Sequence, residues 1–259
     1  MDSSITALLH GPHTARAGTP APSPRAAHPP LIRLEHVSRS YGDTRVPILA
    51  LDDVSLDVAR GEFIAIMGPS GSGKSTLMNI IACLDRPTSG TYLFEGHDLG
   101  RAPDDIRTRL RGELFGFVFQ HFHLLPRMSA LEQVELPLVS HHPARRRARA
   151  IAVLRDLGLG DRIHHTPAEL TGGQQQRVAI ARALVVAPSV LFADEPTGAL
   201  DTATSHELME LLARLALEQG ITVVLVTREA EIAAYARRII RMRDGRIAED
   251  TSRREPVSA

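Results

Sequence analysis

The sequence has no tryptophan, one cysteine and one lysine, and only 4% of its 259 residues are aromatic. The single thiol, Cys83, excludes a disulfide framework and is typical of a reducing compartment. The formal net charge is +0, so no global positive field attracts a nucleic acid, and we expect no nucleic-acid partner. No apolar run approaches the roughly 18 residues that span a bilayer, so we expect a soluble chain that reaches a membrane only through a partner.

The two ends of the chain differ in composition from the rest. Residues 1–30 include "GPHTARAGTPAPSPRAAHPP", which is rich in proline and alanine and has no periodic apolar face, so we expect a disordered tail. A short polar tail is expected over 251–259. The residues between these tails, 31–250, are enough for one large domain with an ample core.

Arginine carries nearly all the positive charge of the chain. Of the 30 Lys plus Arg residues, only Lys74 is a lysine. A chain that otherwise uses arginine and keeps one lysine indicates a place where a compact ammonium group is required.

A strand, a glycine-rich loop and a helix are predicted around this lysine, in the stretch "FIAIMGPSGSGKSTLMNII". Residues 63–67 form a short apolar strand, and the G-x-x-x-x-G-K-[ST] pattern that follows is typical of a phosphate-binding loop. Its glycines let successive N–H groups point inward at a helix N-terminus, where Lys74 reaches the β- and γ-phosphates and Ser75 binds Mg²⁺. We therefore predict an ATP and Mg²⁺ site formed by Gly68, Pro69, Ser70, Gly71, Ser72, Gly73, Lys74, Ser75 and Thr76.

Two adjacent carboxylates end a second apolar strand, in the stretch "SVLFADEPTGALD". Asp194 is placed to hold Mg²⁺, directly or through water, and Glu195 to polarise the water that attacks the γ-phosphate. Neighbouring carboxylates repel each other, and a metal ion makes such a pair tolerable. We predict that Asp194 is a metal ligand and that Glu195 is the catalytic base.

A third segment, "ELTGGQQQRVAIARAL", predicts a second anion site that contains no lysine. Thr171, Gly172 and Gly173 precede a helix, so a hydroxyl and unpaired N–H groups meet at its N-terminus. One chain needs only one triphosphate cradle. We therefore expect a second copy of the chain to close on the first copy's ATP with Thr171, Gly172, Gly173 and Gln174.

These three motifs, in this order and spacing, resemble the ABC transporter ATPase family, over about residues 31–249. The resemblance implies an α/β fold, a P-loop NTPase ABC cassette with a RecA-like core, an antiparallel β subdomain and an inserted α-helical subdomain. It places the nucleotide core at about 31–123 and 175–250 and the helical subdomain at about 124–174.

The same resemblance implies roles for three further residues. Tyr41, in "SRSYG", matches the aromatic residue that stacks on adenine. Gln120, in "FVFQHFHLLP", matches the glutamine that touches Mg²⁺ and the attacking water and links to the membrane partner. Asp201, in "GALD", matches the aspartate that communicates across the dimer.

Finer similarity concerns the stretches "STLMNIIACLDRPTSGTY" and "DEPTGALD", which look like the branch of macrolide exporters, lipoprotein-releasing ATPases and the cell-division cassette. In that branch the membrane partner has few transmembrane helices and a large extracytoplasmic domain. Because this chain ends soon after the cassette, we expect its permease to be a separate polypeptide. The expected location is cytoplasmic, on the inner face of the cell membrane through that permease.

The stretch "ITVVLVTREAEIAAY" departs from the family pattern at Arg228, where the family has a histidine that contacts the γ-phosphate. Arginine is longer, permanently charged and only a donor. Two alternatives stay open. Arg228 can reach the γ-phosphate and stabilise the transition state, or it can pair with Glu195 and slow hydrolysis.

The expected function is an ATPase that dimerises on ATP and drives export, or the extraction of lipids or lipoproteins, through a membrane permease. An ATP-dependent switch that transmits force to an extracytoplasmic enzyme, with weak hydrolysis because of Arg228, is the alternative. ABC ATPases that act on chromosomes insert long coiled coils between the motif halves, and the short gap from Gln120 to Thr171 disfavours that class.

Overall fold

The computed structural model describes residues 29–42, 47–139 and 142–252. Most of the expected N-terminal tail, and residues 253–259 of the expected C-terminal tail, lie outside the described residues. The final strand continues to Ser252, beyond the boundary expected at residue 250, because Thr251 and Ser252 still pair with the preceding strand.

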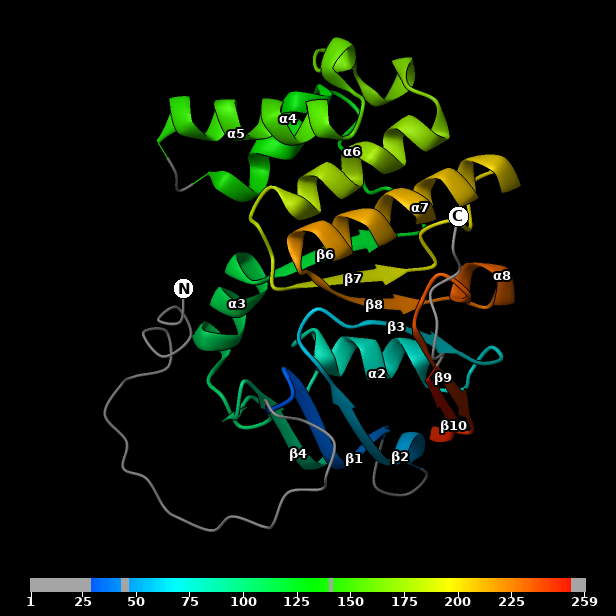
Figure 1. The fold of residues 1–259 in the computed structure, drawn as a ribbon. Helices are drawn as coiled ribbons and strands as arrows, with labels where there is room; N and C mark the ends of the chain where they lie inside the picture. Colours follow the sequence, from blue (N-terminus) through cyan, green and yellow to red (C-terminus); the bar gives the residue numbers. More distant parts are fainter. Residues whose placement is uncertain (1–28, 43–46, 140–141, 253–259) are drawn as a thin grey trace.

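A six-stranded sheet forms the centre of the molecule (Figure 1). Its order is β10-β9-β3-β8-β7-β6, and all neighbouring strands are parallel except β10, which is antiparallel to β9. The strands are β3 (Phe63–Met67), β6 (Phe115–Phe119), β7 (Val190–Asp194), β8 (Thr222–Val226), β9 (Arg238–Arg243) and β10 (Arg246–Ser252). Every residue of β3 and β8 is buried, as is typical of parallel strands that are covered on both faces.

A second, antiparallel sheet has the order β2-β1-β4-β5. Its strands are β1 (Ile32–Tyr41), β2 (Ile48–Val58), β4 (Ser89–Phe94) and β5 (His97–Asp98). This sheet confirms the antiparallel part of the expected fold, and α2 (Lys74–Ile81) lies between it and the parallel sheet (Figure 1).

The other helices cover the opposite face of the parallel sheet and its β6 edge (Figure 1). They are α3 (Asp104–Glu113), α4 (Ala130–Glu135), α5 (Pro143–Asp156), α6 (Gly172–Leu184), α7 (Thr202–Gln219) and α8 (Ala230–Ala233), with 3₁₀ turns at Leu136–Leu138, Gly160–Arg162 and Pro167–Glu169. The helix α7 is followed by its C-cap Gly220, whose φ of 66° suits glycine. No helix in the described part of the chain is long and apolar enough to cross a membrane.

Alternate residues of the parallel strands enter two different hydrophobic cores. Ile64 and Ile66 pack with α2 and the antiparallel sheet, whereas Phe63, Ala65 and Met67 pack with the helices on the other face. Because the side chains of a strand alternate between its two faces, the parallel sheet contributes residues to both cores, one on each face. The carboxyl ends of β3, β7 and β8 therefore meet at one edge, which is where ligands bind in open α/β sheets.

Helices predominate in the segment expected as the helical subdomain. The helices α4 and α5 pack against each other, and both contact α6, which in turn packs on β6 of the parallel sheet. The helix α6 begins at Gly172, so it starts inside the expected range of 124–174 and continues into the core.

Candidate nucleotide site

The loop between β3 and α2 depends on glycines for its shape. Gly73 is the N-cap of α2 with a φ of 97°, and a Cβ there would lie 2.6 Å from the carbonyl oxygen of Ala50. Gly68 has a φ of 155°, and its Cβ would lie 2.4 Å from the carbonyl oxygen of Met242. Side chains at these two positions would clash with backbone, so the loop can approach its neighbours only with glycine.

Lys74 is folded back over this loop. Its Nζ donates to the carbonyl oxygens of Gly68, at 2.9 Å, and Pro69, at 2.8 Å, and the residue is only 7% exposed. Burial lowers the pKa of Lys74, and the positive charge of Arg228 lowers it further, while Glu195 and Asp194 oppose the shift. The ammonium group therefore lies within electrostatic range of both predicted carboxylates.

The hydroxyl groups of the loop fit a phosphate ligand. Ser72 is buried, and within the described residues its Oγ has no hydrogen-bond partner. An unpaired buried hydroxyl in this loop is a polar atom that a bound anion can satisfy. Ser75, the predicted Mg²⁺ ligand at the first turn of α2, is exposed and so is open to a ligand, while Ser70 is exposed and Thr76 is half-buried.

Asp194 is the last residue of β7, between Phe119 of β6 and Val226 of β8. Burial and the adjacent Glu195 raise its pKa, whereas Lys74 and Arg228 counteract this shift. A half-buried carboxylate with a raised pKa becomes more stable as an anion when a cation binds nearby. The donor set of Asp194 and Ser75 therefore fits Mg²⁺, which prefers oxygen ligands.

Glu195 adopts an unusual backbone conformation. Its φ is 46°, and its N–H donates to the carbonyl oxygen of Val226 at 2.8 Å. A left-handed conformation in a residue other than glycine is costly and persists where the surrounding structure holds it, which is common at functional sites.

Arg228 contacts Glu195 directly. Its Nε donates to Oε1 of Glu195 at 2.6 Å, and the two side chains are 61% and 19% exposed respectively. The sequence left two contacts open for this arginine, the γ-phosphate or Glu195, and the structure contains the pairing with Glu195.

Gln120 follows β6 and lies against Gly198, in the loop after β7. A Cβ at Gly198 would be 2.8 Å from Nε2 of Gln120, so glycine is what allows this approach. Sequence reasoning missed both Gly198 and Gln176, a fully buried residue of α6 whose Nε2 donates to the carbonyl oxygens of Pro196, at 2.6 Å, and Phe119, at 3.2 Å. A glutamine in the middle of "GGQQQRVAI" on the buried face of a helix was the available signal.

The segment at the start of α6 is organised as a capping box. Thr171 N–H donates to Oε1 of Gln174 at 3.0 Å, and Gln174 N–H donates to Oγ1 of Thr171 at 3.3 Å. A Cβ at Gly173 would be 2.5 Å from Cγ2 of Thr204, and one at Gly172 would be 3.5 Å from Leu200. Among the described residues, no hydrogen bond or ion pair joins this helix start to the Lys74 loop.

Asp201 lies next to this segment as the N-cap of α7. Its Oδ1 accepts from the N–H of Thr204 at 3.0 Å and its Oδ2 from the Thr204 hydroxyl at 2.6 Å. These hydrogen bonds lower the pKa of Asp201. Thr204 thus lies between Asp201 and Gly173. These two residues, both predicted to face the second copy, are therefore neighbours.

Tyr41 lies at the end of β1. Its hydroxyl donates to Oδ2 of Asp85 at 2.6 Å, and the guanidinium of Arg39 lies 4.4 Å from the ring centroid. Tyr41 is 38% exposed, so part of the ring is accessible to a planar ligand.

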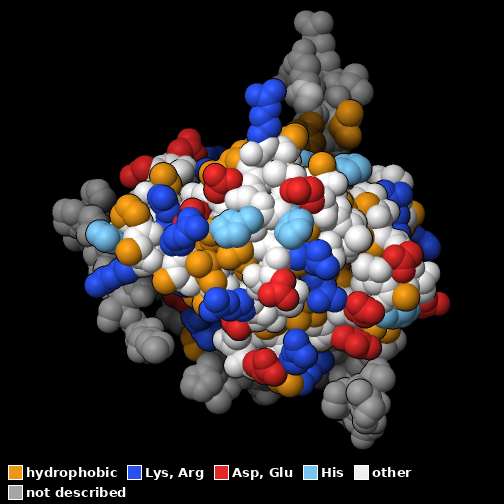
Figure 2. Space-filling view, turned by 90° about the horizontal axis from the view of Figure 1, so that it is seen from above, with side chains coloured by type: hydrophobic (Ala, Val, Ile, Leu, Met, Phe, Trp, Pro, Cys, Tyr) orange, Lys and Arg blue, Asp and Glu red, His pale blue; other side chains and the backbone are white. Residues whose placement is uncertain are grey.

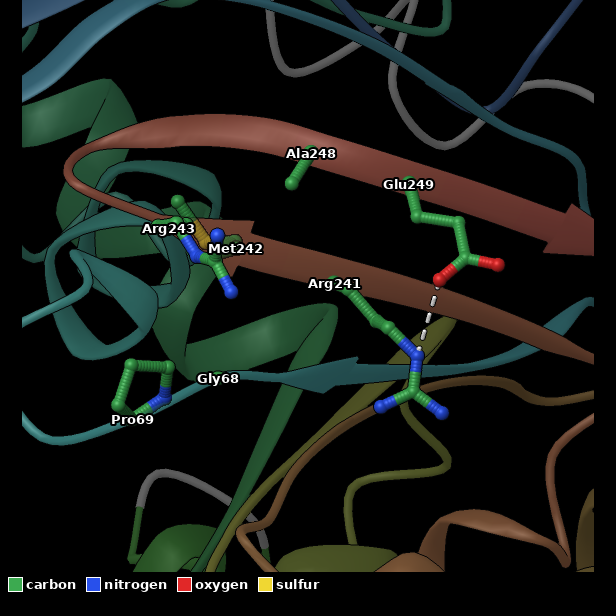
Figure 3. Close-up of a pocket in the computed structure, with 7 residues that line it drawn as sticks. All are labelled: Gly68, Pro69, Arg241, Met242, Arg243, Ala248 and Glu249. Carbon is green, nitrogen blue, oxygen red and sulfur yellow. Dashed lines mark ion pairs between the residues drawn. The ribbon is translucent and has the colours of Figure 1, made fainter.

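A cavity of about 410 Å³ adjoins the loop from the other side (Figure 3). It is lined by Gly68 and Pro69 and by β9 and β10 residues, of which Arg241 and Glu249 form an ion pair at 3.2 Å. The cavity therefore shares Gly68 and Pro69 with the predicted phosphate site, whereas Lys74, Asp194 and Glu195 do not line it.

Comparison with known proteins identifies the family. Residues 51–198 match the family described as "ABC transporter". The macrolide export ATP-binding/permease protein MacB of Marinobacter nauticus is 51% identical over 229 residues, which cover 88% of this chain and 35% of that protein. MacB of Azoarcus sp. is 50% identical over 93% of this chain and 37% of its own length. The chain therefore spans about a third of the length of these curated relatives.

Solved structures agree with these relatives. The ATP-binding cassette MJ0796, in a dimeric post-hydrolysis state bound to ADP and Pi, is 43% identical with a TM-score of 0.79, covering 86% of this chain and 99% of that one. The structure of cbiO1 from Clostridium perfringens is 30% identical with a TM-score of 0.78, covering 87% of this chain and 89% of that one. The phosphate loop, the paired carboxylates, the cassette fold and these similarities together show that the chain belongs to the ABC transporter family, as an ATP-binding cassette.

Proposed function

We propose that this cassette binds and hydrolyses ATP and that it drives a membrane permease. The observation that carries the proposal is the meeting of Lys74, Asp194 and Glu195 at the carboxyl edge of the parallel sheet, where the two carboxylates counteract the lowered pKa of Lys74 and Lys74 counteracts the raised pKa of Asp194. The 43% identical cassette bound to ADP and Pi supports hydrolysis at the corresponding site.

In the proposed mechanism, Lys74 leaves the carbonyl oxygens of its own loop and binds the β- and γ-phosphates. Ser75, Gln120 and Asp194 hold Mg²⁺, which neutralises the charge on these phosphates when it is bound. Glu195 accepts a proton from water while the water oxygen attacks the γ-phosphorus, and the bond from that phosphorus to the β–γ bridging oxygen breaks. The bond's electron pair leaves with ADP. Tyr41 stacks on the adenine ring.

A second copy completes the proposed site. The segment Thr171–Gln174 makes no hydrogen bond or ion pair with the Lys74 loop of its own chain among the described residues, and Thr171 is exposed. We propose that this segment closes on the ATP of the partner copy and that Asp201, beside it, contacts the same interface. The dimeric structures of MJ0796 support this arrangement.

The proposed membrane partner is a permease that carries a large extracytoplasmic domain. The curated relatives are named ATP-binding/permease proteins, which supports coupling to a permease, and the branch resemblance supports its large domain. The cassette then works on the cytoplasmic side, peripheral to the inner face of the membrane. Export or the extraction of lipids or lipoproteins is the proposed output.

One observation favours a second candidate function. The ion pair between Arg228 and Glu195 occupies one oxygen of the proposed base. If that pair holds through the cycle, hydrolysis is weak and the ATP-bound dimer is the working state, as in a switch that transmits force to an extracytoplasmic enzyme.

Dimerisation on ATP tests the proposal. We expect Glu195→Gln to bind Mg²⁺-ATP without hydrolysing it and to become a dimer, as measured by light scattering after size-exclusion chromatography. Lys74→Ala should stay a monomer at the same ATP concentration. A Glu195→Gln protein that remains monomeric at saturating ATP would contradict the proposed dimer, and hydrolysis that survives Glu195→Gln would contradict the assigned base.

A further inference from the structure

One arginine of α6 carries a charge that no carboxylate neutralises. Arg182 is half-buried, and burial lowers its pKa. Its Nη1 donates to the carbonyl oxygen of His123 at 2.7 Å, and its Nη2 donates to that of Phe122 at 2.9 Å. Among the described residues these two backbone oxygens are its only hydrogen-bond partners, and it forms no ion pair. Since moving a charge out of water without a counter-ion is costly, the two backbone contacts are what offsets this cost.

Both carbonyl oxygens belong to the loop that begins with Gln120. The strand β6 ends at Phe119, so Arg182 holds the chain just beyond Gln120. The chain turns sharply here, because His123 has a φ of 48° and its ring lies edge-on to that of Phe119, with 5.3 Å between the ring centroids. Gln120 is therefore part of a short, closed turn.

A second side chain of α6 holds the chain on the other side of Gln120. Gln176 is fully buried, and its Nε2 donates to the carbonyl oxygen of Phe119 at 3.2 Å, directly before Gln120. The same Nε2 donates to Pro196 at 2.6 Å, in the loop whose Gly198 lies against the Gln120 side chain. The backbone before and after Gln120 is thus hydrogen-bonded to one helix.

We propose that Arg182 is a positioning residue for Gln120, which fastens the loop after β6 to α6 and so determines where the Gln120 amide lies. This inference rests on the proposed function, because Gln120 is there a ligand of Mg²⁺. Arg182 acts only through the backbone of the loop. Arginine suits this role, since its planar fork has several N–H donors in a fixed geometry and stays protonated.

The contribution of Mg²⁺ to nucleotide affinity tests this role. The measured quantity is the gain in affinity for the β,γ-imido analogue of ATP when Mg²⁺ replaces EDTA, obtained by titration calorimetry for the unaltered chain and for Arg182→Gln. Arg177→Gln is the matched control. Arg177 is also on α6 and also donates to a backbone carbonyl oxygen, that of Leu157 at 3.4 Å, but it makes no hydrogen bond with the loop after β6.

We expect Arg182→Gln to reduce the gain from Mg²⁺ by about tenfold, the usual effect of losing a residue that orients a metal ligand. The affinity in EDTA should stay unchanged, and Arg177→Gln should change neither quantity. Arg182→Lys, which keeps the charge and the ability to donate, should lose less of the gain. An equal loss of affinity with and without Mg²⁺ would overturn the proposal, because Arg182 would then support the site as a whole.

The lysine variant also covers a failure of Arg182→Gln to fold. A lysine has one nitrogen, so it cannot reproduce the two hydrogen bonds that Nη1 and Nη2 make. Arg182→Lys is then expected to lose part of the gain from Mg²⁺ with no change in EDTA. A lysine variant with the full gain would overturn the proposal in that case.

The Gln120→Ala background shows whether the effect passes through Gln120. In that background Arg182→Gln should not reduce the gain from Mg²⁺ any further, because the amide to be positioned is missing. A further loss of the same size would overturn the proposal, since Arg182 would then act independently of Gln120.

Hydrogen–deuterium exchange gives a readout that needs no nucleotide. The backbone of residues 119–125 should exchange faster in Arg182→Gln than in the unaltered chain, because the loop is no longer fastened to α6. The control Arg177→Gln should leave this exchange unchanged. Equal exchange in Arg182→Gln and the unaltered chain would overturn the proposal.

Failure of this role is distinguishable from failure of the proposed function. If Lys74→Ala does not weaken binding of the analogue, or if Gln120→Ala leaves the gain from Mg²⁺ unchanged, the proposed site is wrong and the role of Arg182 falls with it. If the gain depends on Gln120 but not on Arg182, only the positioning role is wrong.

Discussion

Asp85 shows how single residues outside the sequence motifs support the site. Its carboxylate accepts from the Tyr41 hydroxyl at 2.6 Å, from Nε of Arg39 at 3.0 Å and from the N–H of Arg86 at 2.7 Å. Although burial raises the pKa of Asp85, the hydrogen bond from Tyr41 and the contacts of Arg86 and Arg39 outweigh it and hold the pKa below its usual value. The tyrosine proposed to stack on adenine is therefore held by an ionised aspartate.

A lowered pKa in the folded state makes Asp85 stabilising when it is ionised. Its contribution is present above the pKa of about 3.9 in the unfolded chain and is lost as the pH falls through the lower folded value. We expect Asp85→Asn to lower the free energy of unfolding by about 1 kcal/mol at pH 7, and this difference should shrink towards pH 3. Urea titrations at the two pH values measure the effect.

Asp161→Asn is the control for this prediction. Asp161 is exposed, and its carboxylate has no hydrogen bond or ion pair in the part of the chain that the structure describes. Its replacement should leave the free energy of unfolding unchanged. A loss in Asp85→Asn that is equal at both pH values would contradict the assigned charge.

The requirement for glycine at position 73 of the phosphate loop can be tested by substitution. Gly73→Ala places a methyl group 2.6 Å from the carbonyl oxygen of Ala50 at a φ of 97°, whereas Gly71→Ala has a φ of 78° but no atom within 4 Å. We expect about 1–2 kcal/mol of destabilisation in Gly71→Ala from conformation alone and about 2–5 kcal/mol in Gly73→Ala, where the clash adds to it. Denaturant unfolding of the two variants measures the difference, and equal losses would contradict a steric role.

The roles of individual residues were only partly predictable. The sequence predicts the loop around Lys74 because the strand, the glycines and the lysine are contiguous, and it predicts Glu195 because it follows a strand directly. It could not predict which contact Arg228 makes, because that depends on the angle at which two strand ends leave the sheet. The link from Tyr41 to Asp85 joins residues far apart in the chain, so no local pattern indicates it. The functional roles of these residues stay predictions.

At the scale of secondary-structure elements, α6 depends on its N-terminal cap. Thr171→Ala removes the hydroxyl that accepts from the N–H of Gln174 at 3.3 Å. We expect a loss of about 1 kcal/mol in the free energy of unfolding, while Thr171→Ser, which keeps the hydroxyl, should lose little. Chemical denaturation followed by circular dichroism checks both variants. If serine were as destabilising as alanine, the methyl group and not the cap would stabilise the helix.

The elements themselves were more predictable than their arrangement. The apolar runs ending at Met67, Ala193 and Val226 are strands, in agreement with the short continuous apolar segments that parallel strands buried on both faces have. The antiparallel sheet was expected from the family resemblance and not from the residues, and the order of the strands was not predicted. The domain boundary expected at residue 250 lies inside β10, since the pairing of this strand with β9 leaves no compositional signal.

On the scale of the whole molecule, the surface carries both signs of charge. Figure 2, the view from above, shows basic side chains (Lys and Arg, blue) and acidic side chains (red) interspersed over that face, in agreement with the formal net charge of +0. The specific attraction for a polyanion must then be local to the phosphate loop.

Nucleotide binding should therefore stabilise the molecule as a whole. At 100 times its dissociation constant, a ligand that binds only the folded state adds about 2.7 kcal/mol, which raises the Tm of a chain of this size by about 5–10 °C. We expect this shift with Mg²⁺-ATP in a thermal scan of Glu195→Gln. The additional change Lys74→Ala should remove most of it, and a shift that survives would place the nucleotide elsewhere.

The burial of Lys74 has a practical consequence for footprinting. Since it is the only lysine, an amine-selective acylating reagent has one side-chain target, and a lysine-specific protease can cut only after residue 74. With 7% exposure and Nζ bound to two carbonyl oxygens, that target is shielded until the loop opens. The rate of acylation or cleavage then reports on the opening of one loop, in the native chain, without any engineered label.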